Sequence, residues 1–201
     1  MQRFTHSFQG VIFDLDGTLV SSNLNFSALR QAIQCPVEQD ILHFIAKLPA
    51  VQAAQAQRII EQAEQLDAQQ ARLLNGTEAL LDFLLMQQIP MAIVTRNSKA
   101  AALQKVEQNN LPIDLILSRE DGPAKPDPTS LIQVATLWGL AADKIAFVGD
   151  HHYDVDAANR AGMQSVLLTF DEHKAYQHQA RFVYRDLQQL LQAMPLISLC
   201  A

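Results

Sequence analysis

Short apolar runs alternate with segments of helical periodicity over most of the chain. The runs are rich in branched side chains, a composition typical of strands that helices cover on both faces. They predict strands at residues 11–13, 91–94, 113–117, 145–148, 165–169 and 182–184. Apolar positions at helical spacing between them predict helices at residues 78–88, 99–109, 128–138, 154–161 and 186–194. The alternation predicts an α/β fold built on a Rossmann-like parallel sheet with right-handed crossovers.

The segment between residues 22 and 74 breaks this alternation. It contains no strand-like run, and its pattern predicts three helices, at residues 24–33, 37–48 and 51–74. Pro36 and Pro49 separate them, because proline ends one helix and favours the start of the next. We therefore predict an α/β core domain of residues 1–21 and 75–201 and an all-helical domain of residues 22–74. The apolar tail at residues 196–199 is expected to pack on the core.

Length and composition indicate an ordinary globular protein. The chain has 201 residues, 49% of them hydrophobic and 18% charged. A chain of this size buries roughly 70% of its unfolded surface, so it folds without a disulfide or a structural metal. Cys35 and Cys200 have no metal-type spacing, and we interpret them as buried or incidental thiols.

Charge and hydropathy limit the classes of partner that the protein is expected to bind. The net charge of −6 argues against nucleic acid and anionic membranes as partners. The longest near-apolar stretch, residues 131–142, falls short of the ~18 residues that a membrane span needs. The N-terminus has no long apolar stretch of the secretory type. We expect a cytoplasmic protein that binds neither nucleic acid nor membrane, and we leave its oligomeric state open.

The first predicted strand ends in Asp14-Leu-Asp16-Gly17-Thr18. Gly17 permits a tight turn there, so both carboxylates can face one cleft at the carboxyl edge of the sheet. The alternative is that the two acids only cap a turn. We favour the cleft, because charges at the end of a buried strand are costly unless they are used.

Two further strand ends carry polar groups. Thr95-Arg96-Asn97 precedes a predicted helix, where a hydroxyl and free amides can hold an anion, although a simple capping turn is the alternative. Gly149-Asp150 and Asp154 place two more acids after the strand at residues 145–148. Lys125 stands in the stiff loop Lys-Pro-Asp-Pro, which presents a cation unless it is merely a surface lysine.

In this order and at these sheet positions, the four motifs resemble those of the haloacid dehalogenase superfamily. The resemblance covers most of residues 8–169, and the helical segment directly after the first motif is similar to the small helical cap of phosphoglycolate phosphatase-like members. It implies a phosphoryl-transfer enzyme with the fold predicted above. We interpret Arg96, His151 and His152 as small departures from the commonest family pattern, the two histidines as loop residues.

The resemblance implies catalytic roles for three residues. Asp14 is expected to be the nucleophile that accepts the phosphoryl group, and Asp16 the acid that protonates the leaving oxygen and then activates water. Lys125 is expected to neutralise charge on Asp14 and on the phosphoryl group, and so to count also among the substrate-binding residues.

The resemblance also implies the binding residues. Thr95, together with the amide of Arg96 or Asn97, is expected to hold the phosphoryl oxygens. The expected metal ligands are Asp14, Asp16 through its carbonyl, Asp150 and Asp154. A carboxylate about 4 Å from a phosphate charge costs about 4 kcal/mol at an effective dielectric constant of 20, which one lysine cannot offset for several acids. Hard oxygen ligands favour Mg²⁺ as the cofactor.

The predicted function is therefore a Mg²⁺-dependent phosphatase that acts on a small phosphorylated metabolite. A phosphomutase of the β-phosphoglucomutase type uses the same motifs and is the first alternative. A carbon–halogen hydrolase and a non-catalytic module that binds a phosphorylated ligand are the others. Arg30, His43 and Arg58 of the helical segment could reach an anionic leaving group, but exposed helix residues are the favoured interpretation, and we name no specificity residue there.

Overall fold

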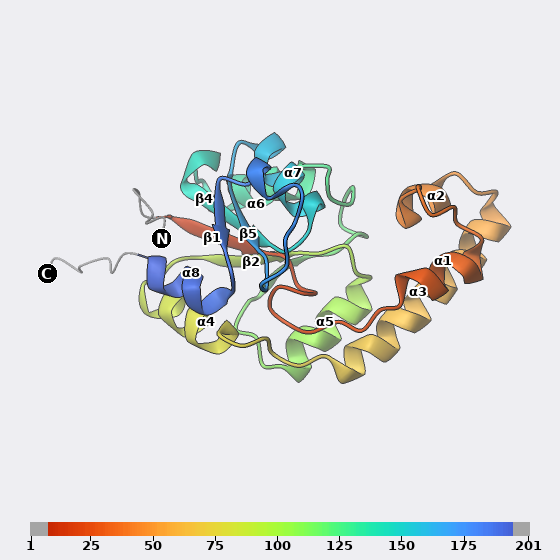
Figure 1. Ribbon diagram of the computed structural model, residues 1–201, viewed down its shortest axis with the longest axis horizontal. Helices are drawn as coiled ribbons and strands as arrows, with labels where there is room; N and C mark the ends of the chain where they lie inside the picture. The colour runs from red at the N-terminus through yellow and green to blue at the C-terminus, as the bar shows by residue number, and fades with distance from the viewer. Residues whose placement is uncertain (1–7, 195–201) are drawn as a thin grey trace, which may run out of the picture.

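The computed structural model, which describes residues 8–194, contains one sheet of six parallel strands (Figure 1). The strands are β1 (Gly10–Phe13), β2 (Met91–Val94), β3 (Leu115–Leu117), β4 (Ile145–Gly149), β5 (Gln164–Leu168) and β6 (Phe182–Tyr184). Their order across the sheet is β3-β2-β1-β4-β5-β6, and every neighbouring pair is parallel. The predicted α/β class with a Rossmann-like parallel sheet is confirmed.

Helices cover both faces of this sheet (Figure 1). One face carries α4 (Thr77–Met86), α5 (Lys99–Gln108) and α8 (Leu187–Ala193), and the other carries α6 (Thr129–Trp138) and α7 (His152–Ala161). Two short 3₁₀ turns, Ala142–Lys144 and Gln177–Gln179, complete this part of the chain. In β1, Val11 and Phe13 pack into the first layer and Ile12 into the second, so one buried strand joins both cores.

The predicted strands and helices recur with small shifts in their bounds. The strand predicted at residues 113–117 is shorter, and the helix predicted at residues 154–161 begins earlier. Gly139 and Gly162 end α6 and α7 in the left-handed conformation. Cys35 is a buried free thiol, whereas Cys200 and the tail at residues 196–199 lie outside the described residues.

The helical insertion lies within residues 22–74 and projects away from the sheet (Figure 1). It consists of α1 (Phe26–Ile33), α2 (Ile41–Ala46) and α3 (Ala50–Gln70). Its apolar side chains form a cluster of their own, made by Leu29, Ile33, Cys35, Ile41, Ile45, Ala56 and Ile60. Such a separate core fits the predicted two-domain division, whose boundaries stay a prediction.

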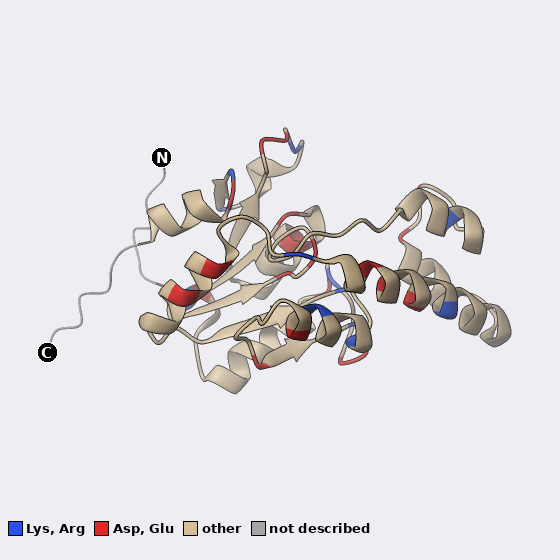
Figure 2. Ribbon diagram, turned by 90° about the horizontal axis from the view of Figure 1, so that it is seen from below, with Lys and Arg blue, Asp and Glu red and all other residues tan. Residues whose placement is uncertain are grey.

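The chain crosses twice between the α/β part and the helical insertion, and the two crossings lie side by side. The amide of Ser21 donates to the carbonyl of Arg72 at 2.8 Å, and the amide of Leu74 donates to the carbonyl of Leu19 at 2.9 Å. Charged residues of both signs occur near this junction (Figure 2). Within residues 8–194, no helix combines the length and the apolar character that crossing a bilayer would require.

Candidate active site

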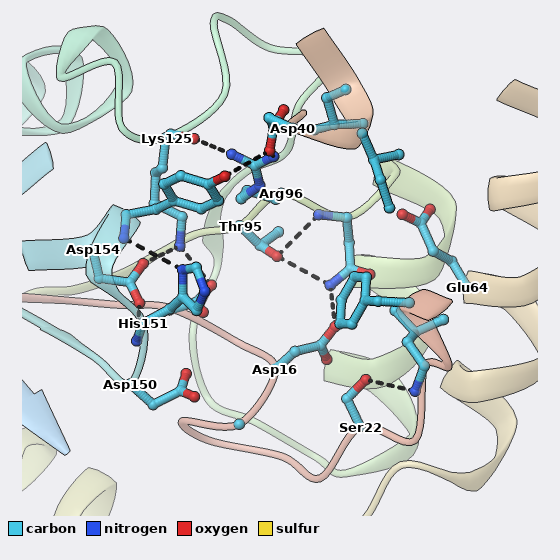
Figure 3. Close-up of a pocket in the computed structure, with 18 of the residues that line it drawn as sticks. Asp16, Ser22, Asp40, Glu64, Thr95, Arg96, Lys125, Asp150, His151 and Asp154 are labelled. Atoms are coloured by element: carbon cyan, nitrogen blue, oxygen red, sulfur yellow. Dashed lines mark hydrogen bonds and ion pairs between the residues drawn. The ribbon is translucent and has the colours of Figure 1, made fainter. Parts of the chain in front are cut away.

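A cavity of about 490 Å³ lies between the carboxyl ends of the strands and the helical insertion (Figure 3). The loops after β1, β2 and β4 contribute to it from the sheet side, as expected for the carboxyl edge of a parallel sheet. All eight residues that the sequence analysis selected line this cavity: Asp14, Asp16, Thr95, Arg96, Asn97, Lys125, Asp150 and Asp154. The catalytic and binding roles expected for them stay predictions.

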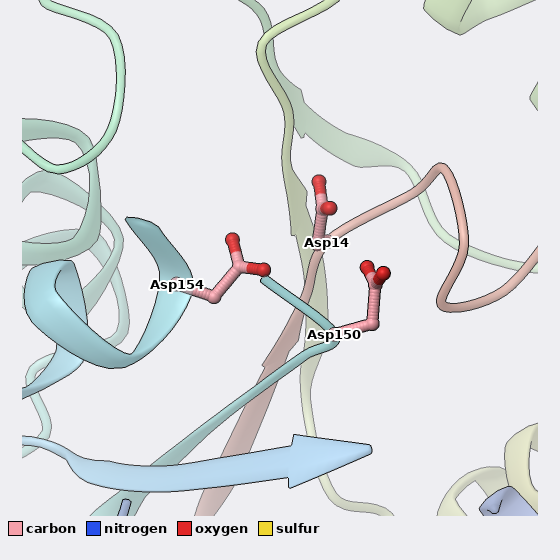
Figure 4. Close-up of side chains that lie close together, drawn as sticks. All are labelled: Asp14, Asp150 and Asp154. Atoms are coloured by element: carbon pink, nitrogen blue, oxygen red, sulfur yellow. The ribbon is translucent and has the colours of Figure 1, made fainter. Parts of the chain in front are cut away.

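Three of the acids form a tight cluster (Figure 4). One carboxylate oxygen each from Asp14, Asp150 and Asp154 lies within 4.8 Å of the others. Two glycines make this approach possible. At Gly17, where φ is +72°, a Cβ would lie 2.9 Å from an oxygen of Asp150, and at Gly149 a Cβ would lie 2.4 Å from Asp154 Cγ. The loops can therefore approach these carboxylates closely only with glycine at both positions.

Burial and mutual repulsion disfavour negative charge on the cluster. Burial raises the pKa of Asp14 to about 7, and the charges of Asp154 and Asp150 add to this effect while Lys125 opposes it. The pKa of Asp150 is raised to about 6, again by burial first and then by Asp154. A cation among these oxygens would relieve both effects.

Lysines partly compensate the cluster. The Nζ atom of Lys125 lies 2.6 Å from Asp14 Oδ1 and 2.8 Å from Asp154 Oδ1, and the side chain is buried. Burial would lower the pKa of Lys125, but the two carboxylates outweigh it and raise that pKa. The structure adds a lysine that the sequence analysis missed, because Lys174 Nζ donates to the carbonyl of Asp150 at 2.6 Å and lies 3.8 Å from its carboxylate. The assumption that Lys125 is the one cation facing the acids was therefore wrong.

The donor set fits a hard divalent cation such as Mg²⁺, which prefers carboxylate oxygen and water. Asp14 and Asp150 would hold it, with Asp154 beside them. Both oxygens of Asp154 already have partners, since Oδ1 faces Lys125 and Oδ2 accepts from the amide of His151 at 2.9 Å. The carboxylate of Asp16 is not part of the cluster. Ligation through the Asp16 carbonyl stays a prediction.

Asp16 lies in the same cavity but points away from Asp150 and Asp154 (Figure 3). Its Oδ2 accepts from Asn97 Nδ2 at 2.7 Å, and its Oδ1 lies 2.5 Å from the Nζ atom of Lys105. Burial raises the pKa of Asp16 above its ordinary value against the opposing effects of Lys105 and Asn97. Thr95 Oγ1 accepts from both the amide and the side chain of Asn97, at 3.2 and 3.1 Å. Thr95, Asn97 and Asp16 thus form one hydrogen-bonded row.

Arg96 is bound to the helical insertion. Its guanidinium donates to the carboxylate of Asp40 and to the carbonyl of Lys125, and it lies 4.3 Å from the ring centroid of Tyr153. The hydroxyl of Tyr153 donates to the same carboxylate at 2.9 Å. Since Asp40 caps the N-terminus of α2, these contacts join the insertion to the strand ends.

Both histidines after Asp150 line the cavity as well. His151 is exposed, and its side chain accepts from the amide of Tyr153 at the start of α7. Asp154 in turn accepts from the amide of His151, so the two side chains cap this helix together. Neither histidine belongs to the group of metal-type side chains found within residues 8–194. Arg30 of the insertion also lines the cavity, where it donates to the carbonyls of Pro36 and Gln39.

The sequence analysis missed the charged residues that join the insertion to the α/β part. Glu64 of α3 accepts from the amide of Ser98 at 3.1 Å and from the Arg119 guanidinium. Asp67 of α3 pairs with Lys105 at 2.7 Å. One signal was available: Lys105 occupies the same face of α5 as Ala101 and Ala102, the apolar face that packs inward.

The fold and the site define an α/β protein whose carboxylate cluster suits a hard cation. The hydrogen-bonded row of Thr95, Asn97 and Asp16 lines the same cavity. A family model described as haloacid dehalogenase-like hydrolase matches residues 11–168. The chain belongs to this family and is an enzyme of the hydrolase class. The resemblance seen in its motifs is confirmed.

Similar proteins agree with this assignment. A haloacid dehalogenase-like hydrolase domain-containing protein of Arabidopsis thaliana is 28% identical over 172 residues, which cover 80% of this chain and 70% of that protein. A phosphoglycolate phosphatase of Pectobacterium atrosepticum is 27% identical over 190 residues, covering 82% of this chain and 81% of the relative. The crystal structure of a hydrolase from Pseudomonas syringae superimposes with a TM-score of 0.77 at 24% identity, covering 91% of this chain and 96% of that one.

Proposed function

We propose that the protein is a Mg²⁺-dependent phosphatase that hydrolyses a small phosphorylated metabolite through a phosphoryl group carried on Asp14. The observation that carries the proposal is that Asp14 and Asp16 line one cavity in different surroundings. Asp14 lies against Lys125 and the two other acids, whereas Asp16 lies against Asn97 and Lys105. Two carboxyl groups held apart in this way suit two roles, nucleophile and proton donor.

The chemistry proceeds in two displacements. A carboxylate oxygen of Asp14 attacks phosphorus, the bond from phosphorus to the ester oxygen breaks, and Asp16 gives that oxygen a proton. Asp16 then takes a proton from a water molecule that attacks the same phosphorus, which breaks the bond to Asp14 and releases inorganic phosphate. Lys125 stabilises the charge on the phosphoryl group in both displacements. A magnesium ion held by Asp14 and Asp150 supplies further charge neutralisation when it is bound.

The helical insertion acts in this proposal as a cap domain, residues 22–74, over the core domain of residues 1–21 and 75–201. Part of the cavity lining from its side is apolar, including Leu24, Leu29 and Ile41, and these side chains exclude water from the transferring group. A cavity of about 490 Å³ suits a small substrate. The phosphoglycolate phosphatases among the relatives support the same substrate class.

The test is phosphate release from 4-nitrophenyl phosphate in Mg²⁺, followed by a panel of small phosphorylated metabolites. EDTA should abolish turnover, and so should Asp14→Asn. The matched control is Asp82→Asn, which makes the same change at an exposed position of α4. Turnover that persists in Asp14→Asn contradicts the proposal. Isomerisation of a sugar phosphate without net phosphate release would point to a phosphomutase instead.

A further inference from the structure

Lys105 on α5 has no exposed side-chain surface at all. An ammonium group is costly to bury unless carboxylates and hydrogen bonds compensate it, and even then a buried ion pair contributes little to stability relative to a well-packed apolar residue. Its neighbours on the same face of α5, Ala101 and Ala102, are apolar and buried. Packing of the helix alone therefore gives no reason for a lysine at this position.

The partners of Lys105 come from two separate parts of the chain. Its Nζ atom lies 2.5 Å from Oδ1 of Asp16, in the loop after β1, and 2.7 Å from Oδ2 of Asp67, near the end of α3. Asp67 also accepts from the hydroxyl of Ser22 at 2.9 Å and from the amide of Asn23 at 2.6 Å. Those two residues belong to the first crossing of the chain into the helical insertion. One ammonium group thus connects the Asp16 carboxylate with the junction of the insertion.

The remaining oxygen of Asp16 is held by Asn97 at 2.7 Å. Two donors from two elements therefore hold the Asp16 carboxylate, the amide of Asn97 after β2 and the ammonium of Lys105 on α5. Of these, Lys105 is the one that also contacts the helical insertion. Removal of the Lys105 side chain would leave the carboxylate with one donor and free to rotate.

We propose that Lys105 is a positioning residue, which holds the Asp16 carboxyl group in the orientation for proton transfer. Through its contact with Asp67, it also couples that orientation to the position of α3. The inference rests on the proposed phosphatase activity, in which Asp16 gives a proton to the leaving oxygen. It assigns no contact between Lys105 and the substrate. Removal of the Lys105 ammonium group should therefore slow the reaction most for substrates whose leaving group needs a proton to depart.

Two aryl phosphates of nearly equal size test this dependence. The phenolate released from phenyl phosphate is far more basic than 4-nitrophenolate, so its departure needs the proton from Asp16 much more. The quantity to compare is kcat/KM, which covers the steps up to and including departure of the leaving group. Asp16→Asn serves as the reference and should lose phenyl phosphate turnover selectively.

Lys105→Met keeps the length of the side chain and removes its charge. We expect kcat/KM for phenyl phosphate to fall about tenfold or more, part of the 10²–10⁴-fold that general acid catalysis supplies, and kcat/KM for 4-nitrophenyl phosphate to fall by no more than about threefold. Lys105→Met combined with Asp67→Asn avoids leaving the buried Asp67 carboxylate unpaired and should show the same selectivity. Lys99→Met, at a half-exposed position of α5, is the control and should change neither value.

The outcomes separate this inference from the proposed function. A wild-type protein that cleaves neither phosphate contradicts the phosphatase itself. If the wild type is active, three results would show that Lys105 only supports the fold. The Lys105 variants could lose kcat/KM for both substrates by the same factor, or they could keep both values. The third result is that the single and the double variant both unfold. An unselective loss in Asp16→Asn would overturn the inference as well, because the leaving group would then not report on Asp16.

Discussion

Gly149, the last residue of β4, leaves room for the side chain of Asp154. A Cβ at this position would lie 2.4 Å from Cγ and Oδ2 of Asp154, far inside van der Waals contact. In Gly149→Ala, Asp154 must therefore move away from Lys125 and from the amide of His151. We expect kcat/KM for phosphate release to fall about tenfold or more and the unfolding temperature to fall by several degrees, since overpacking costs about 1–3 kcal/mol.

Gly122→Ala is the control for this substitution. A Cβ at Gly122 has one contact, at 3.2 Å from the hydroxyl of Ser130, which a small rotation of that side chain relieves. Activity and unfolding temperature should stay close to the wild-type values. Full activity in Gly149→Ala would mean that the position of Asp154 does not matter for the reaction.

Asp14 is expected to lower the stability of the metal-free protein at neutral pH. A carboxyl group whose pKa rises from 3.8 to about 7 on folding holds its proton more tightly in the folded protein, so stability decreases as the pH rises from about 4 to about 7. Asp14→Asn cannot ionise and escapes this loss. In EDTA at pH 8 the variant should exceed the wild type by a few kcal/mol, since each pKa unit corresponds to about 1.4 kcal/mol, and at pH 4 the difference should vanish.

Thermal unfolding in EDTA at the two pH values measures this difference. Asp82→Asn, which replaces an exposed acid, should show none at either pH. A variant less stable than the wild type at pH 8 would show that the attraction between Asp14 and Lys125 outweighs the burial of the charge.

The site residues that the sequence predicts most directly stand immediately after an apolar run. Asp14, Thr95 and Asp150 each follow a buried strand, and parallel strands bring their carboxyl ends to one edge. Lys105 and Asp67 have no such position. They meet because α3 packs on α5, a contact between segments far apart in the sequence that no local pattern encodes.

At the scale of elements, the apolar pattern predicts the existence and order of the helices and strands better than their bounds. The helix predicted at residues 51–74 ends earlier, at Gln70, where the second crossing into the α/β part begins. Hydrogen bonds to Leu19 and Ser21 hold that crossing in an extended conformation. Tertiary contacts thus overrule the helical preference of a Gln- and Ala-rich segment.

Helix α2 is attached to the α/β part by Asp40. This residue caps the helix through the amide of His43 at 3.0 Å and accepts from Arg96 and Tyr153 with its other oxygen. Asparagine caps a helix as well as aspartate does, so Asp40→Asn separates the cap from the charged contact. We expect amide hydrogen exchange over residues 26–46 to accelerate about tenfold, because a hydrogen bond to a charged group contributes about 1.5–3 kcal/mol.

Hydrogen exchange with mass spectrometry resolves this segment from α3, whose exchange should stay unchanged because Glu64 and Asp67 still hold it. Asp40→Ala should accelerate exchange further, since it removes the helix cap as well. Unchanged exchange over residues 26–46 in Asp40→Asn would show that α2 is held by its apolar contacts alone.

At the scale of the molecule, the helical insertion meets the α/β part through charged contacts on both sides of the cavity. Glu64 and Asp67 of α3 are buried against Arg119 and Lys105, whereas Asp40 and Arg96 remain partly exposed. Buried charges that lose their partners are costly, so separation on the α3 side is expensive. We therefore expect the cavity to open at the α2 side, where separation costs less free energy, and not at the junction beside α3.

Metal binding should stabilise the whole protein in a manner that depends on pH. The raised pKa values of Asp14, about 7, and Asp150, about 6, mean that protons compete with a cation below those values. At 100 times its dissociation constant, Mg²⁺ should add about 2.7 kcal/mol at pH 8, or roughly 5–10 °C in unfolding temperature, and much less at pH 5. Thermal unfolding with Mg²⁺ and with EDTA at both pH values measures the effect, and Asp150→Asn should remove most of it. An equal shift at both pH values, or one that survives in Asp150→Asn, would place the metal elsewhere on the protein.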